Sequence, residues 1–133
     1  MATHRKIERM RDVMTSAPHT IGSDQKLSQA HKLMNDYHLR HLPVLRGGKL
    51  VGILSERDLY FLESMAGVDV HIDVIADAMS PEVYTTGPDA DVYEVARTMH
   101  EHKYGCAVVT KGEKVVGIFT MSDALRQLVD LLG

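Results

Sequence analysis

Apolar residues recur along the chain with two alternating periods, one typical of helices and one typical of strands. The first helical pattern spans residues 27–37, and its apolar positions are Leu27, Ala30, Met34 and Tyr37. His31 and His38 lie off that stripe, so we expect both to face solvent. Two later helical patterns have the apolar positions Val92, Val95, Ala96 and Met99 in one and Leu125, Leu128 and Leu132 in the other.

Strands are predicted where short apolar runs flank a glycine turn. Residues 40–45 and 49–54 flank Gly47-Gly48, which is typical of a hairpin. Residues 106–110 and 114–119 flank Lys111-Gly112-Glu113 in the same way. Pro43 cannot donate a backbone hydrogen bond, so it predicts an edge or irregular position for its strand. Helices are expected over 55–64, from Asp91 onward and over 121–132, with short elements at 5–13, 19–22 and 74–79.

The chain contains an internal repeat with an offset of 65 residues. Gly52–Asp58 and Gly117–Asp123 share one pattern: glycine, two apolar residues, a hydroxyl, two variable residues and aspartate. The offset also matches Met14 with Met79 and needs no gap up to Asp123. The pattern predicts an α+β fold made of two β-α-β-β-α units that pack with pseudo-two-fold symmetry.

The repeat also predicts the organisation of the chain. Residues 1–133 are interpreted as one module, with a first repeat over 13–64, a linker over 65–77 and a second repeat over 78–132. The amphipathic stretch 5–13 precedes the first repeat, and we expect it to pack on that repeat or on another subunit.

Each seven-residue segment has two physical interpretations. Ser55 and Thr120 are expected to be helix N-caps, with Asp58 and Asp123 three residues later completing a capping box. The segment can therefore be a well-capped strand-to-helix turn. Alternatively, the free N–H groups of the helix start, the hydroxyl and the carboxylate can hold a phosphorylated ligand with a ribose diol.

Composition narrows the class of protein. The chain has 133 residues, 44% hydrophobic and 25% charged, which is ordinary for a globular domain. No apolar run is long enough to cross a membrane, and the charged N-terminus shows no secretory signal. The single cysteine favours a reducing compartment, so we expect a cytoplasmic protein without membrane insertion. A net charge of −3 argues against nucleic acid as a partner.

No catalytic or metal-binding arrangement is predicted. The eight histidines include the pairs His38/His41 and His100/His102, but neither pair has the spacing of a zinc site. Cys106 falls in a predicted strand, where a packing role outweighs a nucleophilic one. Three function classes remain: a ligand-sensing module, a constitutive adaptor that binds protein without ligand, and an enzyme, for which the sequence offers no residues.

The repeated segments, the Leu42-Pro43-Val44 strand and the openings Met14-Thr15 and Met79-Ser80 together resemble a pair of cystathionine β-synthase (CBS) domains, a Bateman module. The resemblance implies a regulatory, non-catalytic protein that binds adenosine-containing ligands in clefts between the repeats and signals to a partner. AMP, ADP and ATP are the first candidates, with NAD and S-adenosylmethionine after them, and no cofactor is required. It also implies an energy sensor, a stand-alone module, a homodimer and an unidentified regulated protein.

The resemblance implies the following nucleotide-binding positions. In the first repeat they are Thr20, Ile21, Arg40, His41, Leu42, Pro43, Ser55, Arg57 and Asp58. In the second they are Thr85, Thr86, Cys106, Ala107, Val108, Thr120, Ser122 and Asp123. The aspartates would bind the ribose hydroxyls, the Ser or Thr would lie near the phosphates, and the strands would border the adenine.

The two copies depart from the family pattern in different places. Val108 replaces the family's proline in the second copy, and Arg40 replaces its glycine in the first. Arg57 precedes Asp58, whereas Ser122 precedes Asp123. A guanidinium is a strong phosphate ligand, so we expect the first site to prefer phosphorylated ligands and to bind more tightly. The second site is then expected to be weaker, empty or suited to a less charged adenosyl ligand. The alternative for Arg57 is a solvated helix charge.

Overall fold

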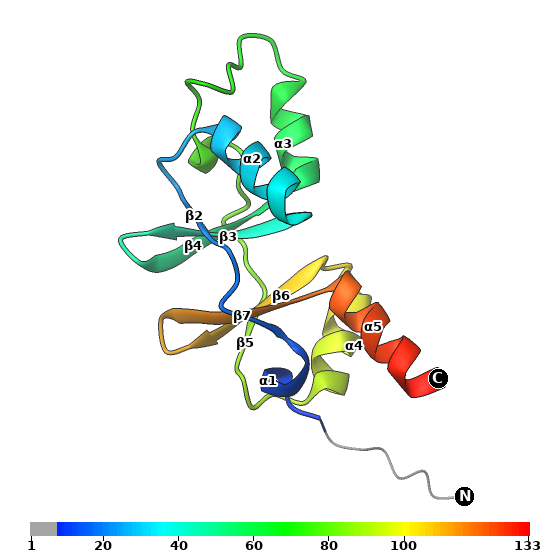
Figure 1. The fold of residues 1–133 in the computed structure, drawn as a ribbon. Helices are drawn as coiled ribbons and strands as arrows, with labels where there is room; N and C mark the ends of the chain where they lie inside the picture. The colour runs from blue at the N-terminus through cyan, green and yellow to red at the C-terminus, as the bar shows by residue number, and fades with distance from the viewer. Residues whose placement is uncertain (1–7) are drawn as a thin grey trace, which may run out of the picture. The chain divides into compact units, whose positions relative to one another are not determined.

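The computed structural model describes residues 8–133, which form two compact units. Residues 19–83 make the first-repeat unit, and residues 8–18 with 84–133 make the second-repeat unit. Each unit contains a small sheet with its helices gathered on one face (Figure 1). The predicted α+β class and the tandem β-α-β-β-α order are confirmed, while the pseudo-two-fold packing and the boundaries 13–64, 65–77 and 78–132 stay predictions.

The first-repeat unit has a three-stranded sheet with β3 in the middle, parallel to β2 and antiparallel to β4. Its elements are β2 (Ile21–Gly22), α2 (Leu27–Tyr37), β3 (His41–Arg46), β4 (Lys49–Ser55), α3 (Glu56–Glu63) and the 3-10 turn η1 (Ile75–Asp77). Gly47 and Gly48 have φ of 57° and 80°, a left-handed pair that forms the tight turn of the β3–β4 hairpin.

Only part of the apolar stripe predicted for α2 is buried in the core of this unit. Leu27, Ala30 and Met34 are buried against strand residues, but Tyr37 is 53% exposed and stacks on His19. The expectation that His31 faces solvent is also wrong. His31 is half-buried, and its Nε2 lies 2.5 Å from Glu63 Oε2 on α3. Polar periodicity does not reveal a partner on another helix.

Pro43 does not lie on an edge strand as one expectation had it. It is fully buried on the central strand and pairs with Ile53 of β4. β2 begins to pair with β3 only at Val44, one residue later, and the β3–β4 register shifts between Val44 and Leu45. The short β2 therefore does not extend to the residue that lacks a donor.

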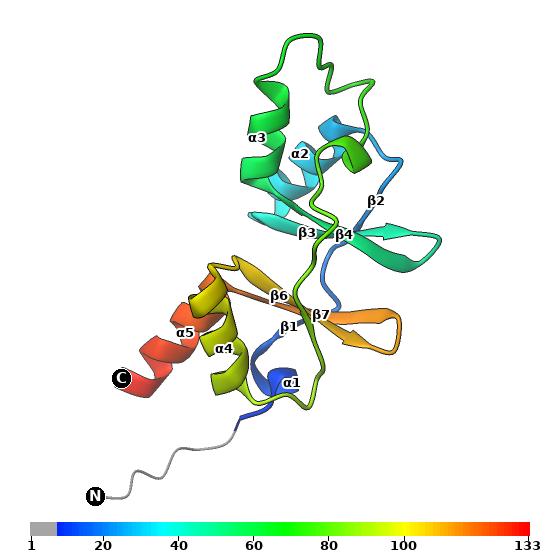
Figure 2. The ribbon, with the colours of Figure 1, turned by 180° about the vertical axis from the view of Figure 1, so that it is seen from behind.

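The segment after α3 packs back onto its own unit (Figure 2). Leu27 N donates to Asp73 O at 3.0 Å, and Ile75 is fully buried in the core. Ile53 and Ser80 exchange two backbone hydrogen bonds of 2.9 Å each. The predicted linker and helical turn are thus structural parts of the first-repeat unit.

The second-repeat unit has a four-stranded sheet of order β1-β7-β6-β5. Its elements are α1 (Met10–Val13), β1 (Thr15–Ser16), β5 (Thr85–Thr86), α4 (Val92–His102), β6 (Cys106–Lys111), β7 (Lys114–Thr120) and α5 (Met121–Leu132). Val95, Met99 and Phe119 are buried in its core. Val95 and Met99 belong to the predicted apolar stripe of α4, and Phe119 comes from β7.

The N-terminal helix differs from its prediction. It begins at Met10, because Arg9 is extended and pairs with Asp91, while residues 5–7 lie outside the described part of the chain. Met10 and Val13 are buried in the core of the second-repeat unit rather than on the first repeat. The start of the chain therefore completes its final repeat.

Candidate functional site

Both predicted capping boxes form, one at the start of α3 and one at the start of α5. Ser55 N donates to Asp58 Oδ2 at 3.0 Å, and Asp58 N donates to Ser55 Oγ at 3.0 Å. Thr120 N donates to Asp123 Oδ2 at 2.9 Å, and Asp123 N donates to Thr120 Oγ1 at 3.4 Å. In each unit a hydroxyl and a carboxylate thus meet at a positively polarised helix start.

In the first-repeat unit, the start of β3 lies beside this helix start. His41 is directly opposite Ser55 in the β3–β4 register, and Arg40 O accepts a hydrogen bond from Glu56 N at 2.9 Å. Burial lowers the pKa of His41, while the Asp58 carboxylate opposes this and the Arg40 charge adds to it. Arg40, His41, Ser55 and Asp58 therefore share one end of the sheet, and ligand binding by them stays a prediction.

The remaining predicted residues of this unit contribute in different ways. Ile21, Leu42 and Pro43 are almost completely buried, so these residues offer almost no exposed surface to a ligand. Thr20 is half-buried and directly precedes β2. Arg57 is exposed in the first turn of α3, a position compatible with both of its interpretations.

The second-repeat unit repeats the arrangement with different side chains. Cys106 lies opposite Thr120, and burial raises the pKa of its thiol to about 12. Ala107 and Val108 are fully buried, and Ser122 is exposed. The early strand, Thr85–Thr86, pairs with Val108 and Val109. The structure brings these positions together within the unit, and ligand binding by them stays a prediction.

The two aspartates differ in their environment. Asp123 is 3% exposed, and its Oδ1 accepts from Thr15 Oγ1 at 3.1 Å and from Arg126 Nη2 at 2.6 Å. Asp58 is half-buried, and no residue in the described range 8–133 donates to its Oδ1. The sequence reasoning missed Arg126 and the role of Thr15. The 65-residue offset could have revealed the difference between the two aspartates, because it aligns the hydrogen-bond donor Arg126 with Phe61.

Each unit also contains stacked aromatic side chains near its short parallel strand, β2 or β5. The sequence did not predict this stacking. In the first-repeat unit His19 and Tyr37 stack with ring centroids 4.0 Å apart. The equivalent positions in the second-repeat unit, Tyr84 and His102, both stack on Tyr104, with centroids 5.1 Å and 5.2 Å apart. The repeat therefore preserves aromatic stacking with the histidine and tyrosine exchanged.

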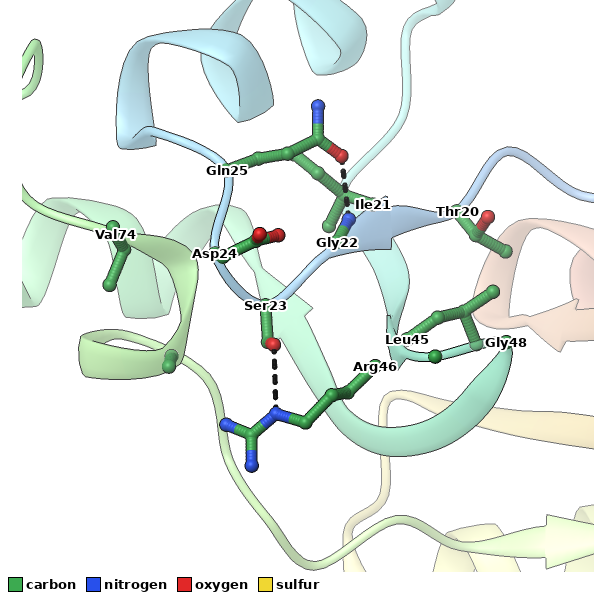
Figure 3. A pocket seen from close by; sticks show the side chains of 12 residues that line it. Thr20, Ile21, Gly22, Ser23, Asp24, Gln25, Leu45, Arg46, Gly48 and Val74 are labelled. Carbon is green, nitrogen blue, oxygen red and sulfur yellow. Dashed lines mark hydrogen bonds between the residues drawn. The ribbon is translucent and has the colours of Figure 1, made fainter.

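A cavity of about 550 Å³ lies in the first-repeat unit, but at the opposite end of the β3–β4 hairpin (Figure 3). Arg46 Nε donates to Ser23 Oγ at 3.3 Å beside it, and Gly22 N donates to Gln25 Oε1 at 2.6 Å. Only Thr20 and Ile21 of the predicted site line this cavity. We assign the candidate site to the Ser55–Asp58 end, because the cavity lacks the capped helix start and its carboxylate.

Residues 8–133 show neither a metal-binding cluster nor a membrane-spanning helix. Within that range no three His, Cys, Asp or Glu side chains converge in a way that could hold a metal ion. The same residues include no helix long and apolar enough to span a bilayer.

Comparison with known proteins identifies relatives whose alignments cover most of the chain. The family model for the CBS domain matches residues 10–63 and 74–130. Inosine-5′-monophosphate dehydrogenase of Korarchaeum cryptofilum is 30% identical over 115 residues, 86% of this chain but only 22% of that enzyme. The chain thus spans less than a quarter of this relative.

Two solved structures share the fold. A protein described as acetoin utilization protein AcuB from Vibrio cholerae aligns with TM-score 0.87 and 32% identity, covering 96% of this chain and 94% of that one. The CBS domain pair of protein MJ0100, solved with 5′-methylthioadenosine and S-adenosyl-L-methionine, aligns with TM-score 0.85 and 27% identity. That alignment covers 94% of this chain and 98% of the other.

Proposed function

Because the chain belongs to the CBS domain family, we propose that it is a non-catalytic regulatory module that senses an adenosine-containing ligand. The related MJ0100 pair, in complex with 5′-methylthioadenosine and S-adenosylmethionine, supports this ligand class. Both of those ligands carry a ribose with a free diol, the group that a carboxylate at the site would bind.

The observation that carries the proposal is the capped start of α3. Asp58 uses Oδ2 to hold the Ser55 amide and keeps Oδ1 without a donor from residues 8–133. A carboxylate oxygen in this state can accept hydrogen bonds from a ribose diol. Amides and the hydroxyl at the helix start favour an anionic group nearby.

Charge in the first-repeat unit supports phosphorylated ligands as the first choice. Arg57 is exposed beside Asp58, and Arg40 lies at the same end of the sheet. Guanidinium groups bind phosphate oxygens in bidentate fashion, so AMP, ADP or ATP fits better than a ligand without phosphate. NAD and S-adenosylmethionine are the alternatives of the same class.

The response to the ligand is proposed to be a population shift. A ligand changes the balance of two conformations only by its different affinity for each. In this module the balance would concern the two repeats or a homodimer, and an unidentified partner protein would respond to it.

Calorimetric titration of the nucleotide-stripped protein tests the proposal. AMP, ADP, ATP, NAD, S-adenosylmethionine and 5′-methylthioadenosine are titrated into wild type, Asp58→Asn and the control Asp36→Asn, which changes an exposed carboxylate of α2. We expect one phosphorylated ligand to bind and Asp58→Asn to weaken it about 100-fold, because two charge-assisted hydrogen bonds are lost. At 100 times its dissociation constant that ligand should stabilise the fold by about 2.7 kcal/mol.

A constitutive adaptor is the second candidate, favoured by the exposed apolar face of α5. Leu125, Leu128 and Leu132 are 61%, 49% and 79% exposed. Partner binding that persists in Asp58→Asn and is lost in Leu125→Glu, together with no binding in the ligand panel, would replace the sensor proposal with this one.

A further inference from the structure

We propose that Arg126 and Thr15 close the ribose-binding carboxylate of the second repeat, so that the chain binds one adenosine ligand rather than two. This inference rests on the proposed function. It assigns roles to two residues outside the seven-residue segments, and it concerns the number of occupied sites.

The first observation is that Asp123 has no free oxygen. Oδ2 accepts from Thr120 N at 2.9 Å and from Thr120 Oγ1 at 3.2 Å. Oδ1 accepts from Thr15 Oγ1 at 3.1 Å and from Arg126 Nη2 at 2.6 Å. Four donors thus occupy a side chain that is 3% exposed, which leaves no acceptor for a ribose diol.

The second observation is that Asp58, at the equivalent position, lacks both closing donors. Phe61 stands where Arg126 stands in the second repeat, and its side chain cannot donate. Ser80 stands where Thr15 stands, and its Oγ donates to Glu82 O at 3.4 Å. The difference between the repeats is therefore made by two side chains around otherwise matching capping boxes.

The hydrogen bonds from Arg126 and Thr15 to Asp123 can be removed by substitution without disturbing the core. The Arg126 side chain is 59% exposed, so its removal leaves no cavity in the core. Thr15 pairs with Ile118 at the edge of the sheet, where valine preserves the shape and removes only the hydroxyl. An opened Asp123 would still keep its Thr120 capping bonds.

Calorimetry with AMP as the probe counts the sites. We expect one AMP per chain for wild type and two for Arg126→Phe combined with Thr15→Val. In the wild type the second site should be absent or at least tenfold weaker than in this double variant. Phe61→Arg places a guanidinium three residues after Asp58 and should weaken the first site about tenfold. Arg97→Phe, which removes an exposed arginine of α4, should leave one site of unchanged affinity.

Two results overturn the inference while leaving the proposed function intact. One is two AMP molecules per wild-type chain, and the other is a single site in the folded double variant. Loss of second-repeat binding in Arg126→Phe would likewise overturn it, because Arg126 would then be a ligand-binding group. Absence of AMP binding by every variant overturns this inference, and the proposed function is overturned as well when no other ligand of the panel binds.

Amide NMR of the wild type keeps the test independent of the variants. Saturating AMP should shift the amides of Ser55 and Asp58 and leave those of Thr120 and Asp123 in place. Equal shifts at both capping boxes would show that the second repeat is open.

Discussion

The two repeats share their fold and their capping boxes but use the aspartate differently. In the first repeat Asp58 is half-buried and its Oδ1 has no donor among residues 8–133, whereas in the second repeat Asp123 is buried and bonded to Thr15 and Arg126. Two segments that share one seven-residue pattern therefore do not imply identical sites. The residues that distinguish them lie three positions beyond one segment and more than one hundred positions before it.

The difference between the two aspartates arises from the segment that pairs with the edge of the sheet in each unit. In the second-repeat unit that segment is β1, which pairs antiparallel with β7 and presents Thr15 to Asp123. In the first-repeat unit the covering contact is the Ile53–Ser80 pair, and Ser80 bonds to Glu82 instead. This comparison supports a structural role for Asp123, while a binding role for Asp58 stays our proposal.

The largest expected effect is on the stability of the aspartate variants. Asp123→Ala leaves Thr15, Thr120 and Arg126 without their acceptor, and should lower the free energy of unfolding by about 3 kcal/mol. Asp58→Ala removes one half of a capping box and should cost about 1 kcal/mol. Urea unfolding followed by circular dichroism measures both. Equal losses would show that the two carboxylates have the same structural role.

The next effect concerns the glycine that opens each segment. A Cβ on Gly52 would lie 2.6 Å from Met79 Sδ and 2.8 Å from the Ser80 carbonyl oxygen, a backbone atom that accepts a hydrogen bond from Ile53 N. The three atoms nearest to a Cβ on Gly117 all belong to the flexible side chain of Met14. Gly52→Ala should therefore cost about 2 kcal/mol and Gly117→Ala about 1 kcal/mol or less.

Thermal and urea unfolding of the two alanine variants tests this difference. Met14→Ala combined with Gly117→Ala is the control, because the smaller side chain frees the space and should remove the part of the loss that is due to the clash. A Gly117→Ala variant less stable than Gly52→Ala would contradict the proposed distinction between backbone and side-chain contacts.

Much of each repeat was predictable from its sequence, because local signals there agree with the final structure. The hairpin at Gly47-Gly48 and the N-caps Ser55 and Thr120 formed as expected, since each depends on neighbours within a few residues. The helix α5 also has its predicted bounds. Periodicity and capping are sufficient where the interaction is local.

Contacts between distant segments were not predictable in this way. The burial of Met10 and Val13 against the last repeat depends on where the chain start packs, which no local pattern specifies. The same holds for the Thr15–Asp123 bond and for the His31–Glu63 pair between α2 and α3. The two capping boxes were therefore predictable from the sequence, while the hydrogen bonds that surround Asp123 were not.

The smallest expected effect is a pH dependence specific to the first repeat. Burial lowers the pKa of His41, so the folded state binds a proton at this residue less readily than the unfolded chain does. The stability due to neutral His41 is fully present above its ordinary pKa of about 6.5 and is lost as the pH falls through the lower folded value. We expect His41→Gln to reduce the loss of stability between pH 8 and pH 5.

Cys106 occupies the equivalent position and gives the matched control. Its thiol, with a pKa raised to about 12, is neutral throughout this pH range, so Cys106→Ser should change stability by the same amount at pH 8 and pH 5. NMR titration of the His41 ring measures the cause directly, and a pKa at or above 6.5 would contradict it. Since His41 lies beside Asp58, a ligand phosphate at this end of the sheet should raise the His41 pKa. A titration of His41 with and without AMP therefore also tests whether the first repeat holds the nucleotide.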